Sequence, residues 1–389
     1  MVTEGNLNLN TQPVLTAPLS LESDDSSSDS NYRAPNVVKR VLSLLNNART
    51  GSDLTRLQLP PLFNIPKSQL QCYGESVYSV NTDVLSKCSH EETPLARFIS
   101  VVAWSISTVR PLAFGLAPYN PVLGETHHVS RGTLNVLLEQ VSHHPPVTAL
   151  QATDKKHNIE MLWCHSPLPK FYGTHIETEV HGSRQLKLLD QNETYTMNSP
   201  KLVIRLFPIP RVEWMGNVRV HCQETGLEAD LSYRGNSFFP RPSMHRSIKG
   251  TIFLSSTSEA LCEINGHWDR TVAVKSVATG ETSIIYNAKE ALAGLKAPVV
   301  DDPKAISSNE STVVWGKVSE AILQKAWDKA REAKSRVEEW QRQMAVERSS
   351  SRQEWAPKHF MVSRSAETGW DCSPKNNAVP PAPIRAPDR

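Results

Sequence analysis

Short strand-like runs alternate with clusters of turn-forming residues between Asn120 and about Arg241, and this rhythm restricts the fold more than any other feature of the sequence. Residues 174–180 and 201–207 are typical runs, since apolar and β-branched side chains recur in them. Strands at this spacing favour an antiparallel meander, and closure into a barrel would pair its edges. The sequence therefore predicts a barrel large enough to hold a ligand. The turn clusters lie at residues 130–132, 154–158, 181–183 and 190–193.

A short amphipathic helix is predicted before this section, over residues 36–49, with Gly51 suited to its end. The segment 57–66 that follows is apolar and extended, because its prolines are incompatible with a helix interior. Two interpretations of the helix remain open: it packs permanently on the core, or it acts as a mobile lid or membrane-touching segment. Its apolar residues have helical spacing and are Val38, Val41, Leu42, Leu45 and Ala48.

Two longer helices are predicted, one on each side of the strand-rich section. Residues 94–110 carry apolar side chains on one face and hardly any charge on the other, so we expect both faces to be buried. Residues 320–347 combine an apolar stripe with many charges, as in a helix that packs one face on the core. The stripe consists of Ala326, Ala330, Ala333, Val337, Trp340 and Met344.

Charge and cysteine usage exclude several classes of protein. The 389-residue chain has 42 Lys and Arg against 40 Asp and Glu, a balance that gives no case for nucleic-acid binding. Its six cysteines are scattered without a Cys-x-x-Cys pair, which favours free thiols in a reducing compartment. The N-terminus lacks the pattern of a secretory signal, and the apolar stretch 98–109 is shorter than the ~20 residues of a spanning helix. We expect a cytoplasmic protein without a transmembrane segment.

The densest polar cluster is the run 139–146 (EQVSHHPP), which lies where a strand-like segment stops. His143 and His144 would point to opposite faces of a regular strand, so both reach one ligand only if the backbone departs from ideal geometry. The two prolines cannot continue a ladder and supply such a departure. The histidine pair is therefore a candidate binding site.

A metal centre or an enzyme active site is the alternative use of these residues. Adjacent histidines lack the spacing by which one element directs two ligands at one metal, and the sequence has no His-Glu-x-x-His motif. It also lacks a Gly-x-Ser-x-Gly elbow, a P-loop and a dinucleotide fingerprint. We expect no metal, no cofactor and no catalysis. The residues weighed for a metal were Glu125, His127, His128, Glu139, His143 and His144.

Lys334, Glu338 and Arg342 are spaced i, i+4, i+8 and lie along one strip of the predicted C-terminal helix. Such a strip is most often a solvated salt-bridge ladder. If it faced the histidine pair, the acid would orient two cations toward a phosphate, which arginine can grip through two hydrogen bonds. The sequence leaves both interpretations open.

The run 139–146 and the run 120–125 (NPVLGE) resemble the signature motifs of oxysterol-binding protein-related proteins, in the short plant-type form. The resemblance extends to residues 266–270, 334–342 and 355–360. It implies an α+β fold, in which a near-complete antiparallel β-barrel surrounds an apolar tunnel with an N-terminal lid helix and a C-terminal helical region. The expected organisation is a disordered tail over 1–33, a single lipid-binding domain over 34–375 and a Pro-rich tail over 376–389. Within the domain we expect a lid and extended segment over 34–66, helices over 67–118, the barrel over 119–300 and the helical C-terminal part over 301–375.

The resemblance also implies a role for each polar group. His143 and His144 would hold the head group of phosphatidylinositol 4-phosphate, helped by Lys334, Glu338 and Arg342. The lid would use Val38, Val41, Leu42 and Leu45. The sequence departs from the family at Ala117, where many members have a lysine that contacts the phosphate, and Arg110 is the neighbour considered as its replacement.

The predicted function is non-enzymatic binding and transport of a sterol or other lipid between membranes, in exchange for the phosphoinositide. One alternative is a lipid sensor that recruits a protein partner in the closed state, and a remote one is a histidine-based phospholipid hydrolase. A monomer in transient contact with organelle membranes is expected. An apolar tunnel removes the large hydrophobic penalty that a lipid meets in water, about 0.8 kcal/mol for each methylene.

Overall fold

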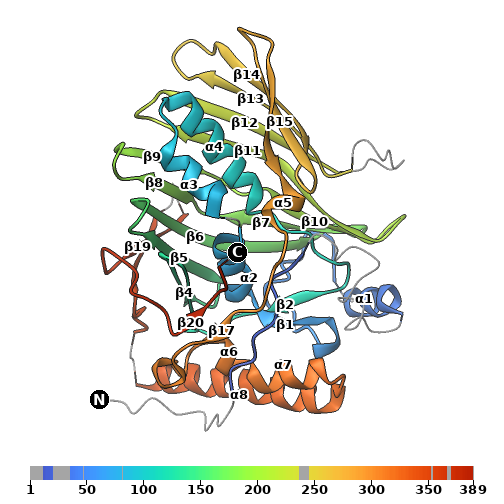
Figure 1. The fold of residues 1–389 in the computed structure, drawn as a ribbon. Helices are drawn as coiled ribbons and strands as arrows, with labels where there is room; N and C mark the ends of the chain where they lie inside the picture. The colour runs from blue at the N-terminus through green and yellow to red at the C-terminus, as the bar shows by residue number, and fades with distance from the viewer. Residues whose placement is uncertain are drawn as a thin grey trace.

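One large, mostly antiparallel sheet with helices packed against it forms the body of the protein (Figure 1). The computed structural model describes residues 12–20, 36–46, 48–80, 82–235, 245–351, 354–365 and 369–388. In this described part the sheet has 16 strands. They are β3 (Thr126–Arg131), β4 (Leu134–Ser142), β5 (Val147–Asp154), β6 (Ile159–Phe171), β7 (His175–His181), β8 (Arg184–Leu188), β9 (Glu193–Met197), β10 (Lys201–Arg205), β11 (Arg211–Cys222), β12 (Leu227–Arg234), β13 (Ser247–Leu254), β14 (Ala260–His267), β15 (Thr271–Ser276), β16 (Thr282–Asn287), β17 (Val299–Val300) and β20 (Ile384–Arg385).

The sheet follows a meander, as the sequence predicts, because successive strands from β10 to β16 pair with their neighbours in the chain. The full order is β16-β15-β14-β13-β12-β11-β10-β7-β6-β5-β4-β3-β20-β17, and β8 and β9 bridge β6 to β11 beside this path. Among the described strands the path has two edges, β16 and β17, so hydrogen bonds do not close it into a complete barrel. The α+β class is confirmed in its coarser form, as a large mixed sheet combined with helices.

Burial patterns show which strands are covered on both faces. β9 and β12 alternate between buried and more exposed residues, as expected for strands with one solvated face. β5 is buried at every position and β4 at all but its last residue, because helices cover one face and C-terminal segments cover the other. These two strands hold the polar run 139–146 firmly in place.

The helices α2 (Gln69–Tyr78), α3 (Thr82–His90) and α4 (Pro94–Ser107) form the predicted helical region. Two of them begin at caps that the sequence encodes. Ser68 and Gln71 form a capping box at α2, and the Thr93 side chain accepts a hydrogen bond from the backbone of Ala96 at α4. Both faces of α4 are buried, as predicted, and Phe98 and Trp104 are completely buried in the main core.

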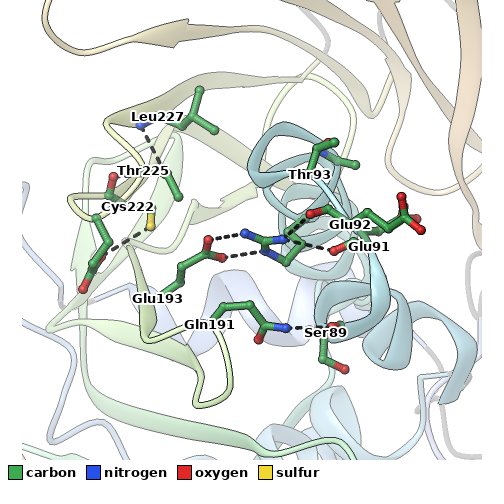
Figure 2. Close-up of polar contacts among 12 residues, drawn as sticks. Ser89, Glu91, Glu92, Thr93, Gln191, Glu193, Cys222, Thr225 and Leu227 are labelled. Atoms are coloured by element: carbon green, nitrogen blue, oxygen red, sulfur yellow. Dashed lines mark hydrogen bonds and ion pairs between the residues drawn. The ribbon is translucent and has the colours of Figure 1, made fainter.

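A buried ion pair fixes these helices to the sheet (Figure 2). The Arg97 guanidinium donates to the Glu193 carboxylate from Nε at 2.9 Å, and it also donates to the Glu91 and Glu92 carbonyls at 3.1 and 2.9 Å. Beside it, the Gln191 amide donates to the Ser89 carbonyl at 3.0 Å. The end of α3 and the start of α4 are therefore held against the β8–β9 hairpin.

The C-terminal part contains α6 (Ser311–Val314), α7 (Gly316–Leu323), α8 (Trp327–Ser350) and a hairpin of β18 (Phe360–Ser365) with β19 (Gly369–Pro374). The helix predicted over 320–347 is confirmed over residues 327–347, which lie in α8, but its start is wrong because residues 320–323 belong to the separate helix α7. Lys325 adopts a left-handed φ of 56°, a conformation that ends helices, so the chain breaks between them. The remaining short elements are η3 (Pro61–Phe63), β1 (Asn64–Ser68), β2 (Ala117–Tyr119), α5 (Ala288–Ala291) and η5 (Pro303–Ala305).

Two segments expected to be tails are part of the fold. Within the predicted disordered tail 1–33, residues 12–20 are extended, Val14 bonds to the Thr312 carbonyl at 3.3 Å, and Lys67 donates to the Ala17 carbonyl at 2.6 Å. The rest of that tail lies outside the described residues. In the predicted Pro-rich tail, β20 inserts between β3 and β17, and Ile384 is completely buried. Both corrections have one cause: exposed backbone on the body of the protein offers hydrogen bonds that composition does not reveal.

Candidate functional site

An apolar cavity of about 420 Å³ lies beneath α1 (Val37–Leu45). Its walls come from α1, from the segment 54–63 and from the ends of β6, β7, β10 and β11. A cavity of this size with mainly hydrophobic walls is typical of a small-molecule site. Six of the apolar wall residues are Leu45, Leu54, Phe63, Ile176, Ile204 and Val212.

Helix α1 covers this cavity where the sequence predicts a lid. Val41 and Leu45 line the cavity, Leu42 packs in the cluster of Phe114, Phe171 and Leu206, and Val38 is exposed. The helix approaches the chain closely at Gly115, whose φ is +77° and whose added Cβ would lie 2.4 Å from Cγ2 of Val37. A glycine is needed there for both reasons, and its presence lets α1 pack directly on the cavity.

His143 and His144 lie in the turn between β4 and β5, where the strand register shifts between Gln140 and Ser142. This shift is the departure from strand geometry that the sequence predicts. The centroids of the two rings lie 4.4 Å apart, and the ring planes are tilted by 56° to each other. His143 is half-buried, and its Nδ1–H donates to the Pro121 carbonyl at 2.9 Å.

Both histidines are poor bases in this environment. Burial lowers the pKa of His143 to about 4, and the neighbouring His144 adds to the effect. Burial also lowers the pKa of His144, and so does the positive charge of Arg56. At neutral pH the His143 ring is therefore neutral, with its Nδ1–H engaged and its Nε2 available as an acceptor. An anion bound here would favour the protonated ring.

Lys334 is buried where α8 meets the segment 59–64. Its ammonium donates to the Leu59 carbonyl and, at 2.8 Å, to Oδ1 of Asn64. Burial lowers the pKa of Lys334, while the Glu338 carboxylate at 3.9 Å opposes that shift. The predicted strip is thus not a simple solvated ladder at this end. Arg342 is exposed and donates from Nε to the Glu338 carbonyl at 3.2 Å.

The segment 117–121 links the lysine and the histidine pair. The Asn64 amide donates to the carbonyls of Ala117 and Pro118 at 3.1 and 3.3 Å, while Pro121 accepts from His143. Lys334, with Glu338 beside it, is therefore linked through Asn64 to the start of this segment, at Ala117 and Pro118. The histidine pair contacts its end, at Pro121. Among the contacts of the described residues, none joins Arg342 to the histidines.

Arg56 is a cation that the sequence analysis did not identify. It is exposed in the segment after α1, and its charge acts on His144. Arg110, considered as a replacement for the family lysine at Ala117, is buried and bonds to Ser107 and Ser79 in the interior. Of these two arginines, Arg56 is the one whose charge acts on the histidine pair. No motif in the sequence marks it.

The interior end of the cavity contains polar groups, of which the sequence analysis considered Arg110 and missed His165 and Arg184. Arg110, His165 and Arg184 are buried and line the cavity. Arg184 donates to Oγ1 of Thr108 at 2.8 Å and lies 5.5 Å from the centroid of the Trp163 ring. Burial lowers the pKa of Arg184 to about 10 and that of His165 to about 3. The cavity thus has apolar walls and a polar interior end, where Glu75 lies near Arg110.

The residues weighed for a metal each have a structural partner. The Glu125 carboxylate accepts from Trp315 Nε1 at 2.8 Å and from Ser311 Oγ at 2.6 Å. His127 Nδ1 contacts Glu310 at 2.7 Å, and His128 Nε2 donates to the Pro380 carbonyl at 2.9 Å. Glu139 accepts from the backbone of residues 358 and 359. Within the described residues no group of three or more His, Cys, Asp or Glu is arranged to hold a metal ion.

An apolar cavity with a covering helix and a polar rim defines a protein that encloses a ligand with an apolar body. Comparison with known proteins identifies the group: the family model for oxysterol-binding protein matches residues 41–378, and the chain belongs to this family. Oxysterol-binding protein-related protein 4B of Arabidopsis thaliana is 52% identical over 374 residues, which are 95% of this chain and 97% of that protein. Oxysterol-binding protein-related protein 5 of Mus musculus is 32% identical over 82% of this chain and 37% of its own length.

Two solved structures share the fold. The Osh1 ORD domain in complex with cholesterol superposes with a TM-score of 0.72 at 21% identity and covers 94% of this chain and 90% of its own. The Osh3 ORD in complex with PI(4)P from Saccharomyces cerevisiae superposes with a TM-score of 0.66 at 20% identity and covers 95% of each chain. In the described part of our protein, every helix is too short or too polar to cross a bilayer.

Proposed function

We propose that this protein binds one lipid at a time, encloses its apolar body in the cavity beneath α1 and carries it between membranes without chemical change. The observation that carries the proposal is the cavity of about 420 Å³, which has apolar walls and is covered by an amphipathic helix. Solved relatives with this fold hold cholesterol or PI(4)P. We infer that a sterol and a phosphoinositide compete for the cavity, and that the protein acts as a monomer from the cytosolic face of organelle membranes.

The polar rim is proposed as the head-group site. His143 and His144 would contact the phosphate, with Arg56 adding the charge that Ala117 does not provide. Lys334 would serve partly as a positioning residue, because its bonds to Leu59 and Asn64 hold the segment over the cavity mouth. Glu338 orients the lysine, and Arg342 would have to turn inward to reach a ligand.

Helix α1 is proposed as the lid. It has few ties to the body: Val41, Leu42 and Leu45 pack on apolar neighbours, and no side-chain cap fixes its first turn. Opening would expose a small apolar area, which a bilayer would cover. Deleting residues 36–46 should therefore leave a protein that still folds but no longer takes up lipid and shields it from water. Unchanged uptake and transfer by that variant would contradict a lid.

Extraction of defined lipids from liposomes tests the function. We expect the wild-type protein to extract both a sterol and phosphatidylinositol 4-phosphate, and the double variant His143→Ala/His144→Ala to lose the phosphoinositide while it keeps the sterol. If the wild type extracts neither lipid, the proposal fails.

Two further measurements separate the alternatives. Transfer between donor and acceptor liposomes distinguishes a carrier from a sensor, because a sensor binds without rapid delivery. Product analysis after incubation with the phosphoinositide tests a hydrolase, for which the neutral, weakly basic histidines are poorly suited.

A further inference from the structure

Exposed apolar side chains gather on one rim of the protein, around the covering helix. The loop between β10 and β11 presents Phe207 and Ile209, which are 55% and 51% exposed. Tyr172, in the turn between β6 and β7, is 39% exposed. Val38 on α1 and Leu57 in the following segment are each 37% exposed. Large apolar side chains at this exposure are unfavourable in water when they lie together.

Backbone contacts place these five residues on neighbouring segments. Leu206 donates to the Thr174 carbonyl at 2.9 Å, which joins the β10–β11 loop to the β6–β7 turn. Gly51 donates to the Phe171 carbonyl at 2.7 Å, which joins that turn to the chain leaving α1. Figure 1 shows α1 beside the end of the sheet where β7 and β10 lie. We name Val38, Leu57, Tyr172, Phe207 and Ile209 the apolar rim.

The loop that carries Phe207 and Ile209 is built to hold them outward. Pro208 and Pro210 alternate with them and restrict the backbone, so the two side chains are presented with little loss of conformational freedom. Leu206, the preceding residue, is buried in the cluster beneath α1 and anchors the loop. Just outside the loop, Arg205 and Arg211 both bond to the single carboxylate of Glu213 at 3.0 Å.

Positive charge lies on the α1 side of the apolar rim. Lys39 and Arg40 are exposed on α1, and Arg49 and Arg56 are exposed in the chain that follows it. The acid within this stretch is Asp53, whose carboxylate accepts from the Thr55 backbone at 2.7 Å. Apolar side chains beside a row of exposed cations match the interface of an anionic bilayer, where apolar groups enter the acyl region and cations contact head groups.

We propose that the apolar rim is the membrane-docking face, and that Phe207 and Ile209 insert into the bilayer next to α1. This proposal rests on the proposed function and adds to it the surface and the partner: an anionic lipid bilayer. Docking there would place the opening of the cavity against the membrane. The bilayer would also cover the apolar face of α1 that becomes exposed when the helix opens. The lipid would then pass directly between the apolar cavity and the acyl region of the bilayer.

Vesicle flotation with the full-length protein tests the docking face. Vesicles of phosphatidylcholine with phosphatidylserine are mixed with wild type, with Phe207→Ser/Ile209→Ser, and with the control Val277→Ser. Val277 is 52% exposed and follows β15, which lies five strands from β10 in the strand order. We expect the double variant to partition at least about tenfold more weakly, because two side chains lose burial, and the control to behave as wild type.

The electrostatic half is tested with Lys39→Ser/Arg49→Ser, which should weaken binding to the anionic vesicles and leave binding to pure phosphatidylcholine unchanged. Equal flotation of Phe207→Ser/Ile209→Ser and wild type would overturn the proposal, as would an equal loss in the Val277→Ser control. A dimer of the wild type that disappears in the double variant would assign the rim to a second copy of the chain, and this result would overturn it too.

Uptake of a sterol from a soluble cyclodextrin complex separates this proposal from the proposed function, because no bilayer is needed. We expect the double variant to take up the sterol as wild type does. A defect there would mean that the loop acts on the cavity and would refute docking. If the wild type itself takes up no lipid, the proposed function fails, while the flotation result still decides the docking face.

Discussion

Phosphoinositide affinity should rise as the pH falls, because His143 must gain a proton to hold a phosphate well. In the free protein its pKa is about 4, owing first to burial and then to His144, and the groups that face it are His144 and the Pro121 carbonyl, with Arg56 beyond. A bound phosphate would return the pKa at least to the ordinary value of about 6.5. Binding then takes up a proton, so lowering the pH favours the complex.

The size of this effect follows from the two pKa values. Between about pH 7 and about pH 5.5, a shift from about 4 in the free state to about 6.5 in the bound state strengthens binding about eightfold. The phosphate loses part of its own charge near pH 6, which acts against the gain. The variant His143→Asn is the control for this effect. It binds the same titrating phosphate but lacks the titrating imidazole ring.

Competition of phosphatidylinositol 4-phosphate with a fluorescent sterol at both pH values measures the effect. The ratio of wild-type to variant affinity should increase about eightfold on acidification, while sterol affinity stays constant. The folded state loses stability over the same range, since a histidine with a lowered pKa takes up its proton more readily when unfolded. Circular dichroism must therefore show an intact fold at the lower pH. A ratio that does not change with pH would refute the role of His143.

Three further predictions concern stability and the covering helix. Gly115→Ala should lower the free energy of unfolding by about 1–2 kcal/mol and speed lipid exchange, because the new methyl group would clash with Val37 and residue 115 has a left-handed φ. Thermal melting measures the first effect and transfer between liposomes the second. Glu125→Ala should destabilise the protein by about 3–5 kcal/mol in urea titrations, since its buried donors lose their acceptor, and Glu125→Gln should cost less. Removal of residues 376–389 should cause aggregation visible in light scattering, because the edge of β3 and the site of Ile384 become exposed; a monomeric, folded truncation would contradict this.

The spacing of apolar residues was sufficient to predict elements whose burial is regular along their length. The covering helix and the buried helix 94–110 follow directly from apolar spacing, and the meander follows from short runs between turns. The break between α7 and α8 was not predictable in this way, because Lys325 adopts a left-handed conformation that helical charge patterning does not signal. Apolar spacing predicts the type of an element and its buried face. It does not predict a break caused by the backbone conformation of a single residue.

Contacts between distant segments account for the other differences. Residues 12–20 and 376–388 have the composition of tails, yet each finds partners on the body of the protein. The same limit applies to the candidate site. The motif identified His143 and His144, but the effect of the Arg56 charge on His144 depends on a contact in space that no local pattern signals. The polar interior end, with Arg110, His165 and Arg184, likewise depends on segments far apart in sequence.

The position of β20 has a consequence for synthesis of the protein. β3 acquires its second neighbour, β20, only when residues near the C-terminus have left the ribosome, because Ile384 pairs with Val129. Until then β3 presents an open edge, and contacts this distant in sequence form slowly. The nascent chain must therefore be kept from pairing with other chains while most of it is already made. The pairing of β20 with β3 is therefore a late step of assembly, and a chain that stops short of Ile384 leaves this edge of β3 open.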